Sequence, residues 1–162
     1  MIHLRDAELS DAKLLNELIE EMGRHERMSV RVCEKRLIKD GFGAAPKFRV
    51  LIAEVGSKVA GYALLFECYS SFQGSGIFLE DLFVRDAFRG KGVGGVLLSR
   101  IASEADERGC FGVLFNVLEW NHSALEFFRR AGASVLLDRK TFCLPSRSLR
   151  ELEPRKANEP LF

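Results

Sequence analysis

The stretch from Ile77 to Gly95, IFLEDLFVRDAFRGKGVGG, most constrains the fold, because it predicts a strand, a glycine-rich turn and a helix in immediate succession. Residues 77–84 are apolar on both alternating faces apart from two adjacent acids, Glu80 and Asp81. A strand that is apolar on both faces is usually covered on both. Ionised carboxylates on such a strand are unfavourable without partners, so the two acids are predicted to be either paired or functional.

The turn after this strand reads RGKGVG over residues 89–94, with glycines at alternate positions just before the predicted helix. Glycine lets backbone N–H groups approach a ligand closely, and the N–H groups in the first turn of a helix are unpaired and partly positive. Arg89 and Lys91 add full positive charges. The combination predicts an anion site, most naturally for phosphate. The alternative is a surface turn that only marks the start of a helix.

Two well-known glycine-rich phosphate patterns fit this turn poorly. A P-loop needs a hydroxyl residue after its lysine, and Lys91 is followed by Gly92. The spacing of Gly90, Gly92 and Gly95 matches Gly-x-Gly-x-x-Gly, but no acid clearly follows a second parallel strand at the distance that a dinucleotide fold requires. The turn therefore predicts phosphate binding of another kind.

Length and composition predict a single globular domain. The chain has 162 residues, 47% of them hydrophobic, and a net charge of +1, which favours neither disorder nor binding to nucleic acid or a membrane surface. We expect one domain over residues 1–153 and a weakly ordered tail over residues 154–162. The sequence shows no signal segment or membrane-spanning run, and its four cysteines are widely spaced. These features predict a cytoplasmic protein with reduced, structural thiols and no metal site.

Hydrophobic periodicity and turn signals predict the element order βααβββαβαββ. The first helix is expected to begin at Ser10 and end at Gly23, and the last to begin with a Ser123–Glu126 capping box and end at Gly132. The other expected helices cover residues 32–39 and 92–108, and the expected strands cover 2–5, 48–55, 59–67, 77–84, 112–117, 134–137 and 140–144. The order predicts a mixed α/β fold with a crossover helix between the two central strands.

The turn and three further segments resemble the GNAT superfamily of acyl-CoA N-acyltransferases. Arg89, Gly92 and Gly94 fill the family signature Arg/Gln-x-x-Gly-x-Gly/Ala. The segments DGFG (40–43), LEDLFV (79–84) and LEWN (118–121), the last followed by FFRRAGA, are similar to the spermidine/spermine and thialysine N-acetyltransferase branch. The likeness runs from about Ile2 to Ala133. It implies a mostly antiparallel sheet of about six to seven strands flanked by helices, with a splayed central strand pair that holds the acyl-pantetheine arm.

The resemblance also implies acetyl-CoA as co-substrate. In the family, main-chain groups of the central strand pair with the pantetheine amides, the first of their N–H groups polarises the thioester carbonyl, and the glycine-rich loop binds the pyrophosphate. The segment that begins the last helix contacts the coenzyme arm, although helix capping alone also explains its polar residues. The implied coenzyme contacts are Leu82, Phe83, Val84, Arg89, Gly90, Lys91, Gly92, Val93, Gly94, Gly95, Asn121 and Ser123.

The acids supply the chemistry that acyl transfer to an amine requires. The amine must lose a proton, and Glu80 is predicted to take it, directly or through a water, because partial burial would raise its pKa toward neutrality. The alternative is a buried ion pair with an arginine. Asp81 either attracts the cationic substrate or caps a bulge in the strand. His25 and Glu26 align with a substrate-contacting pair of the branch, and a solvated helix end is equally consistent with the sequence.

Phe128 departs from the resembled branch. The branch carries at this position a Tyr that is thought to protonate the coenzyme thiolate, and phenylalanine has no proton to donate. Either another group substitutes or catalysis is weaker, and a core aromatic at helical spacing from Leu125 and Ala131 explains the residue structurally. The segment Ser70-Ser71-Phe72 stands where the polyamine enzymes carry an acid and a Trp, which makes a shorter amine as plausible as a long polyamine.

The predicted function is acetyl-CoA-dependent N-acetylation of a primary amine on a small cationic acceptor, by direct attack in a ternary complex. A diamine, a polyamine and a thialysine-like or lysine-like compound are the acceptor classes. Phe128 motivates the alternative of a catalytically impaired CoA-binding regulatory module, and a peptide or protein amine is a third possibility that the paired acids disfavour. The resemblance implies a homodimer, and neither a nucleic acid nor a membrane is expected as a partner.

Overall fold

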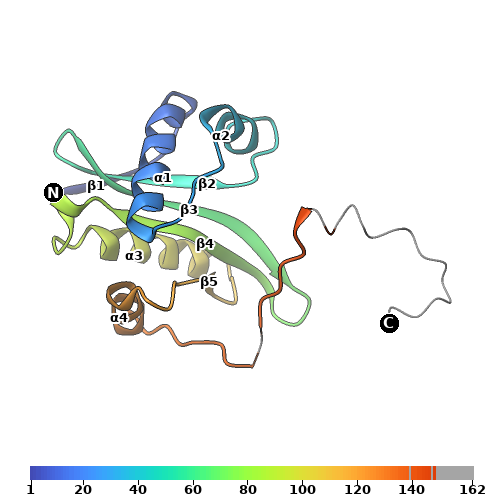
Figure 1. The fold of residues 1–162 in the computed structure, drawn as a ribbon. Helices are drawn as coiled ribbons and strands as arrows, with labels where there is room; N and C mark the ends of the chain where they lie inside the picture. Colours follow the sequence, from blue (N-terminus) through green and yellow to red (C-terminus); the bar gives the residue numbers. More distant parts are fainter. Residues whose placement is uncertain (139, 147, 149–162) are drawn as a thin grey trace. The chain divides into compact units, whose positions relative to one another are not determined.

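The computed structural model describes residues 1–138, 140–146 and 148. Contacts divide the chain into two compact units, Met1–Asn116 and Val117–Phe162, and Figure 1 labels their elements. The first unit contains β1 (Ile2–Asp6), the 3-10 turn η1 (Leu9–Asp11), α1 (Ala12–Glu26), α2 (Glu34–Gly41), β2 (Arg49–Val55), β3 (Lys58–Ser70), β4 (Gly74–Val84), the 3-10 turn η2 (Asp86–Phe88), α3 (Val93–Glu107) and β5 (Val113–Phe115). The second unit contains α4 (His122–Arg130).

The sheet confirms the predicted mixed α/β class. Its five strands lie in the order β1-β2-β3-β4-β5, and every pair is antiparallel except β4–β5, which is parallel. The predicted count of six to seven strands is too high, because residues 134–137 and 140–144 form no strands. Their apolar side chains, Leu137 and Phe142 among them, are exposed. A two-stranded hairpin without a packed apolar face is only marginally stable in water. The alternation of apolar residues was therefore weak evidence for strands there.

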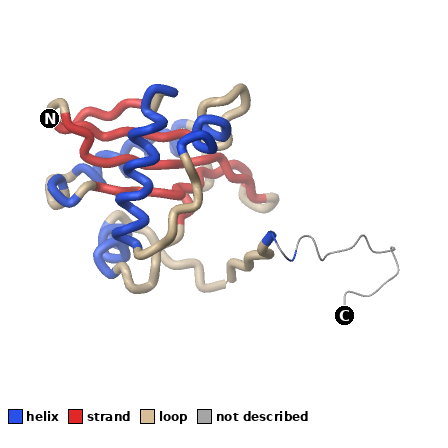
Figure 2. The backbone as a smooth tube through the Cα atoms, turned by 45° about the horizontal axis from the view of Figure 1, so that its top comes forward, coloured by secondary structure: helices blue, strands red, loops and turns tan. Residues whose placement is uncertain are grey.

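Helices cover both faces of the sheet, with α1 and α2 on one side and α3 on the other (Figures 1 and 2). Side chains alternate between the faces, as the period of two requires. The face under α1 and α2 contributes to one apolar cluster, made of Leu15, Leu18, Leu37, Val50, Ile52, Tyr62, Leu64 and Phe83. α3 contacts the strands on the opposite side through a stripe that includes buried Leu97 and Ile101.

Both predicted ends of the first helix are wrong. Ser10 lies in η1, and the cap is Asp11, whose carboxylate is held by the Arg5 guanidinium at 2.7 and 2.9 Å. The helix passes through Gly23 because that glycine permits close packing: a Cβ there would lie 2.5 Å from the Val30 side chain. α1 ends instead at Glu26, and its C-cap Arg27 adopts the left-handed conformation with φ 58°. The extra turn adds His25 and Glu26 to the helix.

A β-bulge in β4 decides which way the acids point. Leu65 pairs with Leu79 and Leu64 pairs with Asp81, so Glu80 is an extra residue with no partner opposite it. A bulge of this kind reverses the facing of the residues that follow it. Leu79 therefore faces the α3 side, whereas Asp81 faces the α1 side with Phe83.

The parallel pair β4–β5 is splayed, as predicted. Only residues 77–79 of β4 pair with β5, and β4 continues to Val84 beyond the point where β5 ends at Phe115. Among the described residues, no strand pairs with residues 80–84 on that edge of β4. Within the same described part of the chain, no helix is long and apolar enough to cross a membrane. No group of three or more His, Cys, Asp or Glu side chains there is placed to hold a metal ion.

Candidate active site

The glycine-rich loop forms an open N-terminus on α3. Gly90 and Gly92 have φ values of 71° and 83°, a region that favours glycine, and Gly92 is the N-cap of α3. The Val96 amide donates to the Gly92 carbonyl at 3.0 Å, so the N–H groups of residues 93–95 precede the helical ladder. Because glycine has no side chain to cap them, an anion is the natural partner for these N–H groups.

The space in front of this loop is open. A Cβ built on Gly90, Gly92 or Gly95 would meet no other atom within 4 Å. A bulky side chain at these positions would therefore project into empty space rather than into the fold. The loop has both the donors and the room that the predicted pyrophosphate needs, and we conclude that its residues fit that group.

The two cations of the loop also bond to the loop itself. Arg89 donates from Nε to the Val84 carbonyl at 2.9 Å and pairs with Asp86 at 2.9 Å. Lys91 donates from Nζ to the Ala87 carbonyl at 2.9 Å. These bonds connect the end of β4 to η2 and to the start of α3, and they leave the positive charges at the loop. Arg89 and Lys91 thus stabilise the loop conformation in addition to supplying charge.

The two acids of β4 differ in burial, and the difference is the reverse of what we expected for Glu80. Glu80, the extra residue of the bulge, is exposed, so the prediction that it is partly buried is wrong. Burial instead raises the pKa of Asp81 to about 6. The Asp81 carboxylate accepts a hydrogen bond of 2.9 Å from the Tyr62 hydroxyl, and this bond partly opposes the rise.

The structure brings a third acid to the same place. Glu26, in the last turn of α1, is half-buried, and this burial raises its pKa while the neighbouring charge of His25 lowers it. The charges of Glu80 and Glu26 both raise the pKa of Asp81, so each of the two lies close enough to Asp81 to act on it. His25 itself is exposed. We call Glu26, Glu80 and Asp81 the acid cluster.

The charge of His25 acts on Glu26, but the acid cluster has no Lys or Arg partner within the part of the chain that the structure describes. Among the described residues, no Lys or Arg side chain forms an ion pair with any of its three members. The nearby Arg85 is occupied by Glu21, at 2.7 and 2.9 Å, and this pair ties α1 to the end of β4. The arginine partner that we considered for Glu80 is therefore not present in the described part of the chain. The cluster is suited to bind a cation from outside the protein.

Sequence reasoning did not single out Tyr62, which stands on β3 and is fully buried. By pattern it is one more aromatic residue in an apolar strand. Its contact with Asp81 depends on the β3–β4 register and on the bulge at Glu80, which no local pattern reveals. The only available signal was that a buried Tyr hydroxyl usually needs a hydrogen-bond partner.

Asp81→Asn is expected to stabilise the protein at neutral pH. The folded chain keeps a proton on Asp81 up to about pH 6, whereas the unfolded chain loses it near the ordinary value of 3.8, so stability falls as pH rises through this window. Asn keeps an acceptor for Tyr62 and has no charge to bury. We expect the variant to be more stable by about 1–3 kcal/mol at pH 7.5 and equally stable near pH 4.

Melting temperatures at the two pH values check this prediction. Asp106→Asn, at an exposed position of α3, is the control and should show no such difference between pH 4 and pH 7.5. A lower melting temperature for Asp81→Asn than for the wild type at pH 7.5 would contradict the unfavourable burial of this carboxylate.

α4, in the second unit, begins differently from the predicted capping box. Its N-cap is Asn121, whose side chain accepts from the Ala124 amide at 3.2 Å and from the Ser123 hydroxyl at 3.0 Å. Glu126 does not bond back to the cap but pairs with Arg130 at 2.8 Å. Capping therefore accounts for Asn121, and the contacts of Asn121 and Ser123 with a coenzyme stay a prediction.

Phe128 is buried, with 9% of its surface exposed, and packs edge-on against Phe127 with ring centroids 5.0 Å apart. This burial agrees with the interpretation of Phe128 as a core aromatic residue. Its place relative to a coenzyme thiolate stays a prediction.

Comparison with known proteins assigns the family. The profile described as "Acetyltransferase (GNAT) family" matches residues 12–133. The chain belongs to the GNAT acetyltransferase family. This match includes α1, the whole of β2 to β5, the glycine-rich loop and α4. The resemblance inferred from the four sequence segments is confirmed.

Individual relatives agree with this assignment. The chain is 32% identical over 164 residues to the thialysine N-epsilon-acetyltransferase of Bos taurus, covering 93% of this chain and 96% of the relative. It is 32% identical over 139 residues to the human spermidine/spermine N(1)-acetyltransferase-like protein 1, covering 80% of this chain and 20% of that longer protein. Among solved structures, an integron cassette protein from the mobile metagenome of V. cholerae has a TM-score of 0.77 at 20% identity, covering 93% and 96% of the two chains, which supports the fold.

Proposed function

We propose that this GNAT protein transfers an acetyl group from acetyl-CoA to a primary amine of a small cationic acceptor, by direct attack in a ternary complex. One observation carries the proposal: β4 bears two acids at its bulge that form no ion pair among the described residues, and it leads directly into an open glycine-rich helix N-terminus. A site for a cation and a site for a phosphate thus lie along one continuous segment. The names of the thialysine and spermidine/spermine relatives support an amine acceptor.

The coenzyme half of the site uses mainly backbone groups. Acetyl-CoA, when bound, supplies an activated thioester. The N–H groups of Val93, Gly94 and Gly95 would hold its pyrophosphate, with positive charge from Arg89 and Lys91. Residues 82–84 lie on the edge of β4 that no strand of the described residues pairs with, and this edge offers main-chain groups for the amides of the pantetheine arm. Asn121 and Ser123 are proposed to contact the same arm.

The acceptor half of the site uses the acid cluster. The ammonium form of the amine is attracted by Asp81 and Glu26, which form no ion pair with a Lys or Arg of the described residues. The amine must lose a proton before it can attack, and we assign this proton to Glu80, directly or through a water. Glu80 suits the role because the bulge leaves it exposed and unopposed beside the splayed edge of β4. His25 is proposed to contact the acceptor at its periphery.

A second candidate function follows from Phe128. If a proton donor at that position were essential, the chain would bind acetyl-CoA and turn over little, as a regulatory module does. Free coenzyme thiol has a pKa in the ordinary thiol range, near about 8.5, so it leaves tolerably well without a dedicated acid. We therefore favour an active enzyme.

A panel of amines with acetyl-CoA, read by release of free thiol, tests the proposed function. The panel contains a short diamine, thialysine, lysine, spermidine and a peptide with a free N-terminus, and thiol release without amine measures background hydrolysis. We expect the short cationic amines to be acetylated, with the peptide much poorer. Acetyl-CoA binding without transfer to any amine would favour the regulatory module, and preference for the peptide would favour a protein acceptor.

Phe128→Tyr is expected to speed thiol release, most clearly below about pH 8, where the departing thiolate gains most from a donated proton. Because Phe128 is buried, a new hydroxyl that finds no hydrogen-bond partner there would lower the stability of the variant by about 1–3 kcal/mol. Turnover and melting temperature measured together check the prediction.

Phe127→Tyr adds the same hydroxyl to the neighbouring residue of α4 and is the control. A destabilised Phe128→Tyr variant with unchanged turnover would show that this position does not face the sulfur. An inactive parent with an active variant would favour the regulatory module.

A further inference from the structure

Tyr62 is a polar aromatic residue in an otherwise apolar environment. It lies in the middle of β3, is fully buried, and belongs to the apolar cluster under α1 and α2. Its ring packs at a tilt against Phe83, with centroids 6.2 Å apart. A phenylalanine would satisfy this packing, so the hydroxyl requires a separate explanation. That hydroxyl donates to Asp81 Oδ2 at 2.9 Å and lies 3.5 Å from Met22 Sδ.

The backbone register holds Tyr62 and Asp81 together. Tyr62 is opposite Phe83 and Asp81 is opposite Leu64, which makes Tyr62 and Asp81 diagonal neighbours on one face of the sheet. If Glu80 paired regularly instead of forming a bulge, Asp81 would face the α3 side with Leu79 and would not meet the hydroxyl. The same bulge thus exposes Glu80 and brings Asp81 to Tyr62.

Tyr62 differs in kind from the other groups that face Asp81. Glu80 on β4 and Glu26 on α1 are both acids, and their charges disfavour the ionised form of Asp81. Tyr62 on β3 is the donor, and its hydrogen bond favours that form. Burial and the neighbouring carboxylates raise the pKa of Tyr62 well above its ordinary value, so it remains a donor throughout the neutral range.

We propose that Tyr62 is a positioning residue for the amine acceptor: its hydroxyl holds Asp81 Oδ2 and leaves Oδ1 directed to the acceptor's ammonium group. The inference rests on the proposed function, because it gives Asp81 a cationic ligand. It adds a residue that contacts neither coenzyme nor acceptor and acts through Asp81. It also explains why a buried strand carries a phenol at this position.

The pH dependence of kcat/KM for the amine in Tyr62→Phe tests the inference. Loss of the donor should make the ionised form of Asp81 less stable, so the acid limb of the profile should move to higher pH by about one unit. We expect a loss of about fivefold near pH 6, approaching tenfold at lower pH, and little loss at pH 9. The loss should appear in the KM for the amine, with the KM for acetyl-CoA unchanged.

Two further variants separate positioning from structural damage. Tyr69→Phe removes the same hydroxyl from β3 at a position that is 79% exposed, and its profile should match the wild type. In an Asp81→Asn background, Tyr62→Phe should have no additional effect, because the residue through which it acts is already neutral. NMR titration of the Asp81 carboxyl in the wild type and in Tyr62→Phe measures its pKa without reference to turnover, and we expect the higher value in the variant.

If the wild type is active but the pH profile of kcat/KM in Tyr62→Phe is unshifted, the inference about Tyr62 is overturned and the proposed function stands. The same holds if Tyr62→Phe loses kcat/KM equally at every pH. An unchanged Asp81 pKa, or a further loss in the double variant, does the same. A wild type that acetylates no amine overturns the proposed function itself.

Discussion

Glu80→Gln is expected to lower the rate of acetyl transfer about 10²-fold near pH 7, the usual scale for the loss of a general base. Gln keeps the size and hydrogen-bonding capacity of Glu80 but cannot accept a proton. The loss should shrink as pH rises, because more of the amine is then deprotonated without help. Single-turnover rates with acetyl-CoA and a short diamine, from pH 6.5 to 9.5, measure it.

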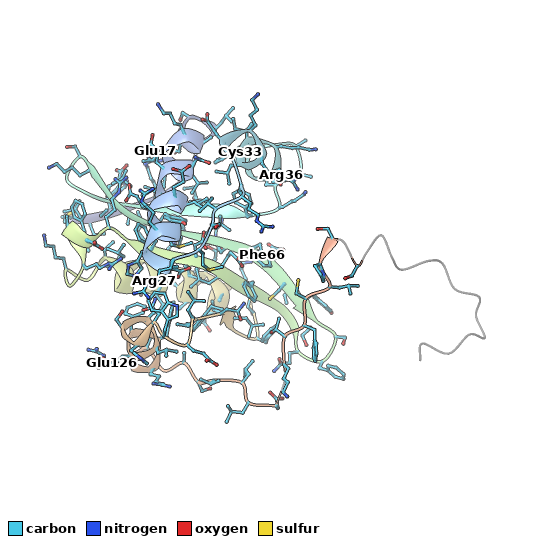
Figure 3. The ribbon with its side chains drawn as sticks, viewed as in Figure 1. Glu17, Arg27, Cys33, Arg36, Phe66 and Glu126 are labelled. Atoms are coloured by element: carbon cyan, nitrogen blue, oxygen red, sulfur yellow. The ribbon has the colours of Figure 1, made fainter. Side chains whose placement is uncertain are left out.

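Glu17→Gln is the matched control for Glu80→Gln. Glu17 is an exposed carboxylate toward the opposite end of α1 from Arg27, as Figure 3 shows, so its loss should not change the rate. A small, pH-independent effect of Glu80→Gln would contradict its role. If Asp81→Asn instead produced a large loss that shrank at high pH, Asp81 would be the base.

Gly95→Val is expected to weaken acetyl-CoA binding about 10²-fold or more, which corresponds to about 2.7 kcal/mol. Its side chain would occupy the open space in front of the loop, where we place the pyrophosphate. Gly95 lies inside α3 without a positive φ, and Val is a better helix former than Gly, so the fold should be retained. Gly92→Val is a poorer test, since the φ of 83° at Gly92 would strain any side chain.

Calorimetric titration with acetyl-CoA measures the predicted loss of affinity, and a thermal melt checks that the fold is retained. Ala102→Val makes a similar addition at an exposed position of α3 away from its N-terminus and should bind the coenzyme normally. Unchanged affinity in a well-folded Gly95→Val chain would contradict the assignment of the loop to the pyrophosphate.

Features encoded locally were predictable from the sequence. The alternation of apolar residues identified β2, β3 and β4, and the glycines of the 89–95 loop predicted the open N-terminus of α3. The order of the elements and the four family segments together indicated the mixed α/β fold and the GNAT family. Each of these signals depends on residues close in the chain, where helix and strand periods and turn chemistry act directly.

Features that depend on packing between distant residues were predicted less well. Gly23 reads locally as a helix stop, but in the fold it lets α1 approach Val30 and continue to Glu26. The alternation in residues 134–137 and 140–144 predicted a hairpin, but the apolar side chains there are exposed and pack against no core among the described residues, so strand pairing is not stabilised. In both cases the local sequence only weakly favoured one structure, and packing against residues from elsewhere in the chain decided whether that structure formed.

For this protein, the sequence by itself determined the family, the central strand with its two acids and the phosphate-type loop that follows it. Only the tertiary structure decided which acid is exposed and which is half-buried. A single extra residue in β4, Glu80, shifts the register against β3, and this shift turns Asp81 toward Tyr62 and Glu26. Strand register is set by pairing with another part of the chain, so the division of roles between the two adjacent acids could not be predicted from their own segment.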